Sequence, residues 1–169
     1  MKNFTKLFLT IALVSVSIVC KSQVFTATEF INLAYKSQSD LKNVIEDKGY
    51  HFSRTDNSDM SENDIFTASN NMSVSVIYPT FEDGQSLLSW EFTNSDGLFN
   101  NLNSEILAAG FKKTETENRN GSRYTVYTYQ RPGMTVTLSR DKMDNPNGIY
   151  RLSVRYASLG AVAVTSVNR

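Results

Sequence analysis

The sequence predicts an α+β fold in which two tandem units, each a helical segment followed by about four strands, form one antiparallel sheet of about eight strands with the helices on one face. The first observation behind this prediction is a set of residues that recurs 61 positions later: Leu41, Ile45, Gly49 and Tyr50 are matched by Leu102, Ile106, Gly110 and Phe111. The second is that similar strand-like segments follow each set in the same order. Self-similarity at a long fixed period indicates a repeated structural unit.

The first unit, residues 28–93, is expected to begin with helical structure. Thr28 is a candidate N-cap before Glu29, and Ser39 is a second candidate before Asp40. Apolar residues then recur at helical spacing up to Gly49, which can end a helix because glycine readily adopts positive φ. The pattern predicts one bent helix or two short ones.

The rest of the first unit is expected to form strands. A strand begins at Tyr50 and Phe52, whereas residues 54–64 are polar and are predicted to form a loop. Alternation of apolar and polar residues predicts further strands over 65–69, 72–77 and 88–92. Asp83-Gly84 is a favoured hairpin turn between the last two.

The second unit, residues 95–157, repeats this order. Ser95 is expected to cap a helix that ends at Gly110, and strands are predicted from 111 and over 124–130, 134–138 and 150–156. Aligning the units places Phe66 with Tyr127 and Trp90 with Leu152. The alternative is a coincidence between two ordinary α+β stretches. The apolar sides of the strands require a cover, and the helices can provide it.

The N-terminal 22 residues have the features of a secretory signal peptide. Lys2 and Lys6 precede an apolar run over 7–19, and small residues precede a cleavage point after Ser22. We therefore expect a periplasmic or secreted protein. Two alternatives remain: an uncleaved N-terminal anchor, and a lipoprotein acylated at Cys20, which would be the protein's one connection to a membrane.

Residues 23–169 have the composition of a single soluble domain, expected over 23–157 and followed by a tail over 158–169. This part holds 14 basic and 17 acidic residues, a net charge of −3, so it should not attract nucleic acid. Cys20 is the only cysteine, so no disulfide can form within the chain and the hydrophobic core must stabilise the fold.

This tandem of helix plus four-stranded sheet resembles the β-lactamase-inhibitor-protein-like fold of secreted bacterial proteins. The resemblance is one of layout and covers most of residues 23–157. It implies that the exposed sheet surface and its loops bind other proteins. The chain departs from inhibitors of that type because they carry disulfides.

Residues suited to catalysis or metal binding are sparse. His51 is the only histidine and is expected on the solvated side of its strand, and no G-x-S-x-G motif is present. Four acidic residues crowd the polar segment, but their spacing is not that of an EF-hand, so a solvated acidic loop is expected there: Asp56, Asp59, Glu62 and Asp64. We expect no cofactor, no metal site and no enzymatic activity; a hydrolase that uses His51 is the third hypothesis.

The open face of the sheet is the candidate functional surface. Its candidate partner-binding residues are Tyr127, Tyr129, Thr135, Thr137, Arg151, Arg155 and Glu91. Tyrosine and arginine beside small hydroxyl residues suit recognition, although an ordinary solvated sheet face has a similar composition. The sequence does not decide whether Tyr127 and Tyr129, or Tyr124 and Val126, point outward.

The leading hypothesis is a non-enzymatic module that binds another exported or envelope protein through this face. The alternative is that a small ligand or lipid binds between the helices and the sheet. That alternative predicts an apolar cavity lined by Met72, Val74, Trp90 and their counterparts in the second unit.

Overall fold

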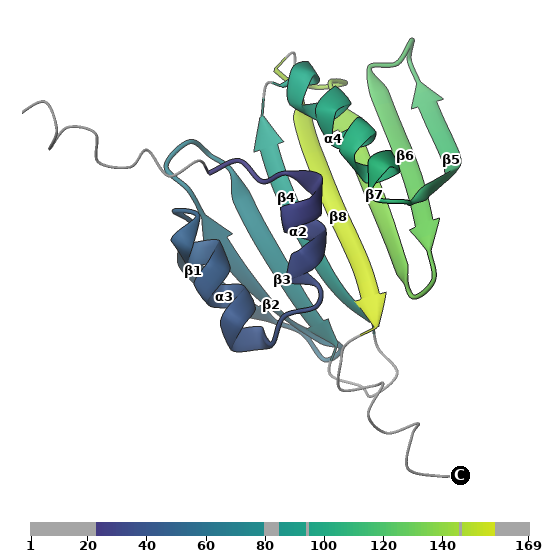
Figure 1. Ribbon diagram of the computed structural model, residues 1–169. Helices are drawn as coiled ribbons and strands as arrows, with labels where there is room; N and C mark the ends of the chain where they lie inside the picture. The colour runs from purple at the N-terminus through teal and green to yellow at the C-terminus, as the bar shows by residue number, and fades with distance from the viewer. Residues whose placement is uncertain (1–22, 80–84, 94, 146, 158–169) are drawn as a thin grey trace, which may run out of the picture.

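The computed structural model describes residues 23–79, 85–93, 95–145 and 147–157, which form three helices on one face of an eight-stranded sheet (Figure 1). The predicted signal peptide with Cys20, the predicted Asp83-Gly84 turn and the predicted tail lie outside these residues. In chain order the elements are α2 (Ala27–Leu33), α3 (Gln38–Asp47), β1 (His51–Asn57), β2 (Ser61–Thr67), β3 (Ser73–Pro79), β4 (Gln85–Thr93), α4 (Asp96–Ala108), β5 (Lys112–Arg119), β6 (Tyr124–Arg131), β7 (Met134–Asp141) and β8 (Ile149–Ala157).

The sheet consists of two antiparallel meanders joined at their last strands. The strand order is β1-β2-β3-β4-β8-β7-β6-β5, and every neighbouring pair is antiparallel. Each half therefore places its helical segment before four strands, and β4 and β8 form the junction. The predicted α+β fold class is confirmed.

The two halves end their long helices in the same way. Gly49 after α3 has a φ of 89°, and Gly110 after α4 has a φ of 83°. The residue after each glycine, Tyr50 or Phe111, donates its backbone N–H to the carbonyl of a buried isoleucine in the last turn, at 3.4 Å in both halves. This is the hydrogen bond of a Schellman ending, and it turns the chain from the helix into the sheet.

The N-caps of the two helices in the first half lie two residues before the predicted ones. The N-cap of α2 is Thr26, whose hydroxyl accepts from the Glu29 N–H at 3.1 Å while the Glu29 carboxylate accepts from the Thr26 N–H at 2.9 Å. The N-cap of α3 is Ser37, which accepts from the Asp40 N–H. In both cases the capping residue lies three positions before the acidic residue, which is the spacing of a capping box.

The predicted loop over 54–64 is instead a polar hairpin of β1 and β2. It carries no alternation signal because every residue of β1 is exposed. Within it, the side chain of Asp64 is only 1% exposed. Its carboxylate accepts from the Thr55 hydroxyl at 2.6 Å and lies 2.6 Å from the Lys42 ammonium of α3. Asp64 thus joins the hairpin to the helix above it.

Both edge strands carry a bulge near their start. The register of β1 shifts between Phe52 and Arg54, and that of β5 shifts between Lys113 and Glu115. The two sites are 61 residues apart, the same interval that separates the helix ends. Each edge strand is also rich in charged and polar side chains that are exposed along most of its length.

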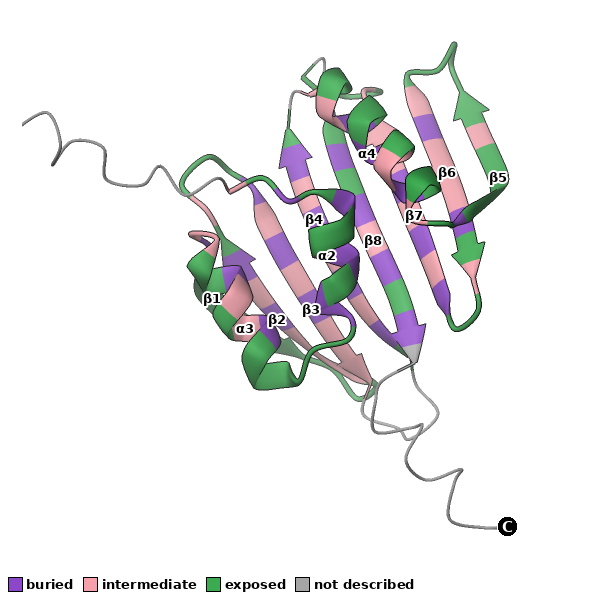
Figure 2. Ribbon diagram, viewed as in Figure 1, coloured by how far each residue is buried: buried purple, intermediate pink, exposed green. Residues whose placement is uncertain are grey.

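The hydrophobic core lies between the helices and the sheet, where buried and partly exposed residues alternate along the inner strands (Figure 2). Trp90 on β4 is fully buried, and the rings of Phe25 and Phe30 lie 5.3 and 6.0 Å from its ring. The Ala27 N–H at the start of α2 donates to the Glu105 carboxylate of α4 at 2.6 Å. Helix α2 therefore connects the helical layers of the two halves.

The strand register changes two of the sequence correspondences between the halves. Val74 and Val136, the aligned residues of β3 and β7, have neighbours on the adjacent strands that the sequence alignment did not match to each other. Val74 is flanked by Phe66 and Trp90, whereas Val136 is flanked by Tyr129 and Val154. Phe66 therefore corresponds to Tyr129 and not to Tyr127, and Trp90 corresponds to Val154 and not to Leu152.

Candidate open-face binding site

A row of small hydroxyl residues crosses the centre of the open face. Five directly paired positions on β3, β4, β8, β7 and β6 carry it: Ser75, Ser89, Ser153, Thr137 and Thr128. Side chains alternate along each strand, so these residues point away from the helices while their sequence neighbours enter the core. Because the side chains at these consecutive paired positions are short, they form a depression along the middle of the open face.

Two hollows lie on this face, with volumes of about 290 and 420 Å³. They share Leu87, Arg151 and Ser153. The smaller hollow is completed by Ser73, Ser75, Ile77, Ser89 and Glu91. The larger one is completed by Tyr124, Val126, Thr128, Thr135, Thr137, Ser139 and Arg155. The larger hollow is therefore lined by hydroxyl groups, two guanidinium groups and a few apolar side chains, with no carboxylate among them.

The structure places five of the predicted partner-binding residues together on the open face: Thr135, Thr137, Arg151, Arg155 and Glu91. Arg151 and Arg155 are exposed on β8, on either side of Ser153. The Arg151 guanidinium donates to the Glu91 carboxylate at 2.7 Å. Glu91 is directly opposite Arg151 in the register of β4 and β8.

Tyr127 and Tyr129 do not belong to this face. They pair with the buried residues Leu138 and Val136, so they point toward the helices. Tyr129 is fully buried and its hydroxyl donates to the Asn103 side chain of α4 at 2.5 Å; burial also raises the pKa of this hydroxyl. Tyr127 packs on Phe99, with ring centroids 5.6 Å apart.

The outward residues of β6 are instead Tyr124, Val126 and Thr128. Sequence reasoning named Tyr124 and Val126 only as the alternative to Tyr127 and Tyr129, because β6 has apolar or aromatic residues on both sides, and it did not name Thr128. Leu87 and Ile77 were also missed as open-face residues, because an aliphatic side chain in a strand is by default assigned to the core. The strict alternation of β3 and β4 about Ser75 and Ser89 is the signal that could have placed them outside.

The predicted acidic loop is not a cluster of free ligands. Asp64 is bound by Lys42 and Thr55, and Asp56 lies 3.1 Å from the Arg54 guanidinium. Within the described ranges, no group of three or more histidine, cysteine, aspartate or glutamate side chains is placed to hold a metal ion. His51 is exposed at the start of β1.

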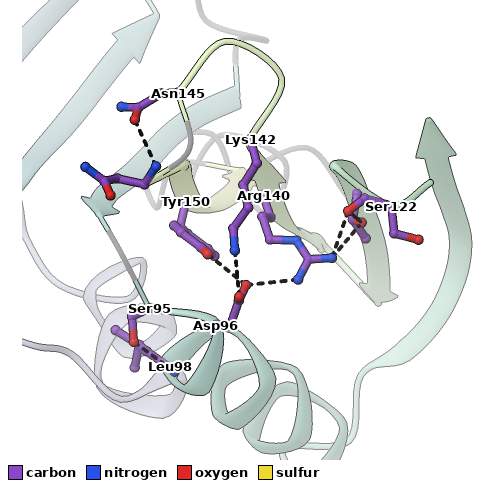
Figure 3. Close-up of polar contacts among 10 residues, drawn as sticks. Ser95, Asp96, Leu98, Ser122, Arg140, Lys142, Asn145 and Tyr150 are labelled. Atoms are coloured by element: carbon purple, nitrogen blue, oxygen red, sulfur yellow. Dashed lines mark hydrogen bonds and ion pairs between the residues drawn. The ribbon is translucent and has the colours of Figure 1, made fainter. Parts of the chain in front are cut away.

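A second polar cluster lies on the helix side of the sheet, at the start of α4 (Figure 3). The Asp96 carboxylate accepts from Lys142 at 2.6 Å, from Tyr150 at 2.7 Å and from Arg140 at 3.0 Å. The hydrogen bond from Lys142, followed by that from Tyr150, holds the Asp96 pKa well below its usual range. The three donors come from β7, β8 and the connection between them, so the cluster fastens α4 to the second meander.

Comparison with known proteins gives no further identification: no family model matches the chain, and no curated protein or solved structure is significantly similar to it. The agreement with the resemblance stated from the sequence is one of architecture, an eight-stranded antiparallel sheet with three helices. No helix among the described residues is both long enough and apolar enough to cross a bilayer.

Proposed function

We propose that this protein is an exported, non-enzymatic binding module that engages another secreted or envelope protein through the open face of its sheet. The observation that carries the proposal is the contrast between the two faces. One face is covered by the three described helices (Figures 1 and 2). The other face presents a hydroxyl row, the exposed arginines Arg151 and Arg155, and two hollows.

The dimensions of the sheet suit a macromolecular partner. Eight strands spaced ~4.8 Å apart give a platform roughly 34 Å wide. A standard protein–protein interface buries about 800 Å² on each partner, which a platform of this width can supply. The two hollows lie within that platform, so a partner with a protruding segment would fit it better than a flat one.

Several sequence-based proposals belong with this function. The charged start and apolar run of residues 1–22 support export. The matched helix ends and bulges at an interval of 61 residues support an internal duplication as the origin of the two halves. The resemblance in layout to inhibitor-like secreted domains supports a protein as the partner.

The alternative is a small ligand or lipid held between helices and sheet. The residues that would have to line such a cavity are buried in the core. Met72 is 8% exposed and Val74 and Trp90 are fully buried. The rings of Phe25 and Phe30 pack against the Trp90 indole. The open face is therefore the better supported site.

A site-specific photo-crosslinker tests the proposal in the cells that export the protein. Placed at Thr137, in the centre of the open face, it should give a discrete adduct with one other protein. Placed at Asn100, exposed on α4, it serves as the matched control and should not give that adduct. An adduct from Asn100 alone, or a small molecule that raises the melting temperature when neither position crosslinks, would contradict the proposal.

A further inference from the structure

The junction of the halves supplies a carboxylate to one exposed arginine and not to the other. On β8, Arg151 and Arg155 flank Ser153; on β4, Glu91 and Leu87 flank Ser89. The antiparallel register places Glu91 opposite Arg151 and Leu87 opposite Arg155, with Ser89 opposite Ser153 between them. Arg151 is neutralised at 2.7 Å by Glu91, whereas Arg155 faces an aliphatic side chain.

From β2 to β6, the row of directly paired strand positions that contains Arg155 holds no acidic side chain. The paired positions from β2 to β6 in this row are Asn63, Ile77, Leu87, Arg155, Thr135 and Gln130. Among the described residues Arg155 has no ion-pair partner, while the other outward-facing arginines on this face do have one. Arg54 pairs with Asp56, Arg119 with Glu117 and Arg151 with Glu91.

We propose that Arg155 is the receptor for a carboxylate side chain presented by the protein partner. The inference rests on the proposed function and specifies its chemistry. The partner segment carries a glutamate or aspartate next to an apolar residue. The carboxylate occupies the large hollow beside Arg155 and Thr135, and the apolar side chain packs on Leu87 and Ile77.

The chemistry of the hollow favours this occupant. An arginine guanidinium binds a carboxylate through two parallel N–H donors, a geometry that also fixes its orientation. The hydroxyl groups of Thr135 and Thr137 supply further donors, and the lining of the larger hollow contains no carboxylate to repel an anion. Leu87 cannot compete for the guanidinium, so the site remains available to an external acid.

A titration with a defined probe tests the assignment. The probe is a short fluorescein-labelled peptide of alternating glutamate and leucine, and its control has glutamine in place of glutamate. We expect the purified protein to bind the glutamate peptide about tenfold more tightly than the control, since one charge-assisted bidentate contact contributes a factor of this order. Arg155→Gln should remove most of this preference.

Two variants make the test specific. Arg54→Gln changes an arginine on the same face that already has a partner, and it should retain the preference. Leu87→Glu supplies the carboxylate from within the chain, opposite Arg155, and should abolish binding of the glutamate peptide. A preference that survives Arg155→Gln, or equal binding of both peptides to the unaltered protein, overturns the proposal.

The titration also tests whether Glu82 and Asp83 of the chain itself occupy the site. A Glu82→Gln, Asp83→Asn variant that binds the glutamate peptide markedly more tightly than the unaltered protein would show that these carboxylates occupy Arg155, which overturns the assignment of a partner. Failure of the general function has a different signature. If the Thr137 crosslink persists in Arg155→Gln, the open-face function stands and this inference falls.

Discussion

Ser89 on β4 and Ser153 on β8 lie directly opposite each other at the junction of the two halves, with their hydroxyl oxygens 3.0 Å apart. They are the central pair of the β4–β8 ladder, and Ser153 is the midpoint of the hydroxyl row. Among the strands that the structure describes, this ladder is the only direct pairing between the two meanders. Their hydrogen bond is therefore a side-chain contact between the halves on the open face.

Removing this contact should weaken the junction slightly. We expect a double-mutant cycle of Ser89→Ala and Ser153→Ala to give a coupling energy of about 0.5 kcal/mol, since the pair is partly solvated and a net intramolecular hydrogen bond contributes 0.5–1.5 kcal/mol. Denaturant unfolding measures it. The pair Ser89 and Thr137, which are not directly paired in the register, provides the control and should be additive.

Two glycines at opposite ends of the α4 segment should respond in opposite directions to the same substitution. A Cβ at Gly110 would meet no atom within 4 Å, but its φ of 83° strains an alanine, so Gly110→Ala should destabilise the protein by about 1 kcal/mol. Gly97 lies in the first turn of α4 and also has open space around it. Gly97→Ala should stabilise by up to about 0.5 kcal/mol because it lowers the entropy of the unfolded chain. Equal effects in thermal unfolding would show that backbone conformation is not the cause.

Asp96 should make stability depend on pH on the acid side. Its pKa is depressed in the folded protein by Lys142, Tyr150 and Arg140, so its contribution is fully present above the unfolded pKa of about 3.9 and is lost as the pH falls through the lower folded value. The side chain is 50% exposed, so we expect Asp96→Asn to cost only about 1 kcal/mol near neutral pH.

The pH series provides its own control. Unfolding free energies of Asp96→Asn and of the unaltered protein should converge progressively as the pH falls below about 3.9 toward the lower folded pKa of Asp96, below which the carboxyl group is protonated in both states. A difference that stays constant down to the lowest pH would mean that the charge of Asp96 is not what stabilises the start of α4.

Replacing Lys42 should destabilise the protein more than replacing an ordinary surface lysine, because the carboxylate that Lys42 pairs with is buried. Lys42→Met leaves the Asp64 carboxylate, 1% exposed, without its counter-charge and should destabilise the protein by about 2 kcal/mol. Asp64→Asn in the same chain should restore part of that loss, since a neutral amide needs no ion pair. Lys36→Met, at an exposed position, is the control and should change the unfolding free energy by less than ~0.5 kcal/mol.

The sequence predicted the architecture through residues whose chemistry is tied to one geometry. Gly49 and Gly110 end helices because they accept positive φ, and the alternation in β3, β4, β7 and β8 assigns one side of the sheet to the core. In the β1–β2 hairpin only the two ends, near Phe52 and over 65–67, were predicted as strands, because neither periodicity nor β-propensity marks the polar stretch between them. The caps at Thr26 and Ser37 could have been found from the acidic residues three positions later.

The candidate site could be predicted only in part. The outward direction could be predicted for residues whose sequence neighbours are plainly apolar: Thr135, Thr137, Arg151 and Arg155. The direction of Tyr127 and Tyr129 could be decided only from the register of β6 against β7, which the sequence does not contain. The pairing of Arg151 with Glu91, and of Arg155 with Leu87, likewise depends on a register between strands 60 or more residues apart. Local patterns carry no information on such distant alignments.

The bulges and charges of the edge strands β1 and β5 affect how this protein can associate with other proteins. Backbone groups at the rim of a sheet can recruit a strand from a second chain, and a local kink lined with ionised side chains opposes that growth. Both outer rims here are protected in this way, which disfavours polymerisation into fibrils at high local concentration. It also favours binding of a partner protein to the broad face of the sheet, since addition of a ninth strand is disfavoured at either edge.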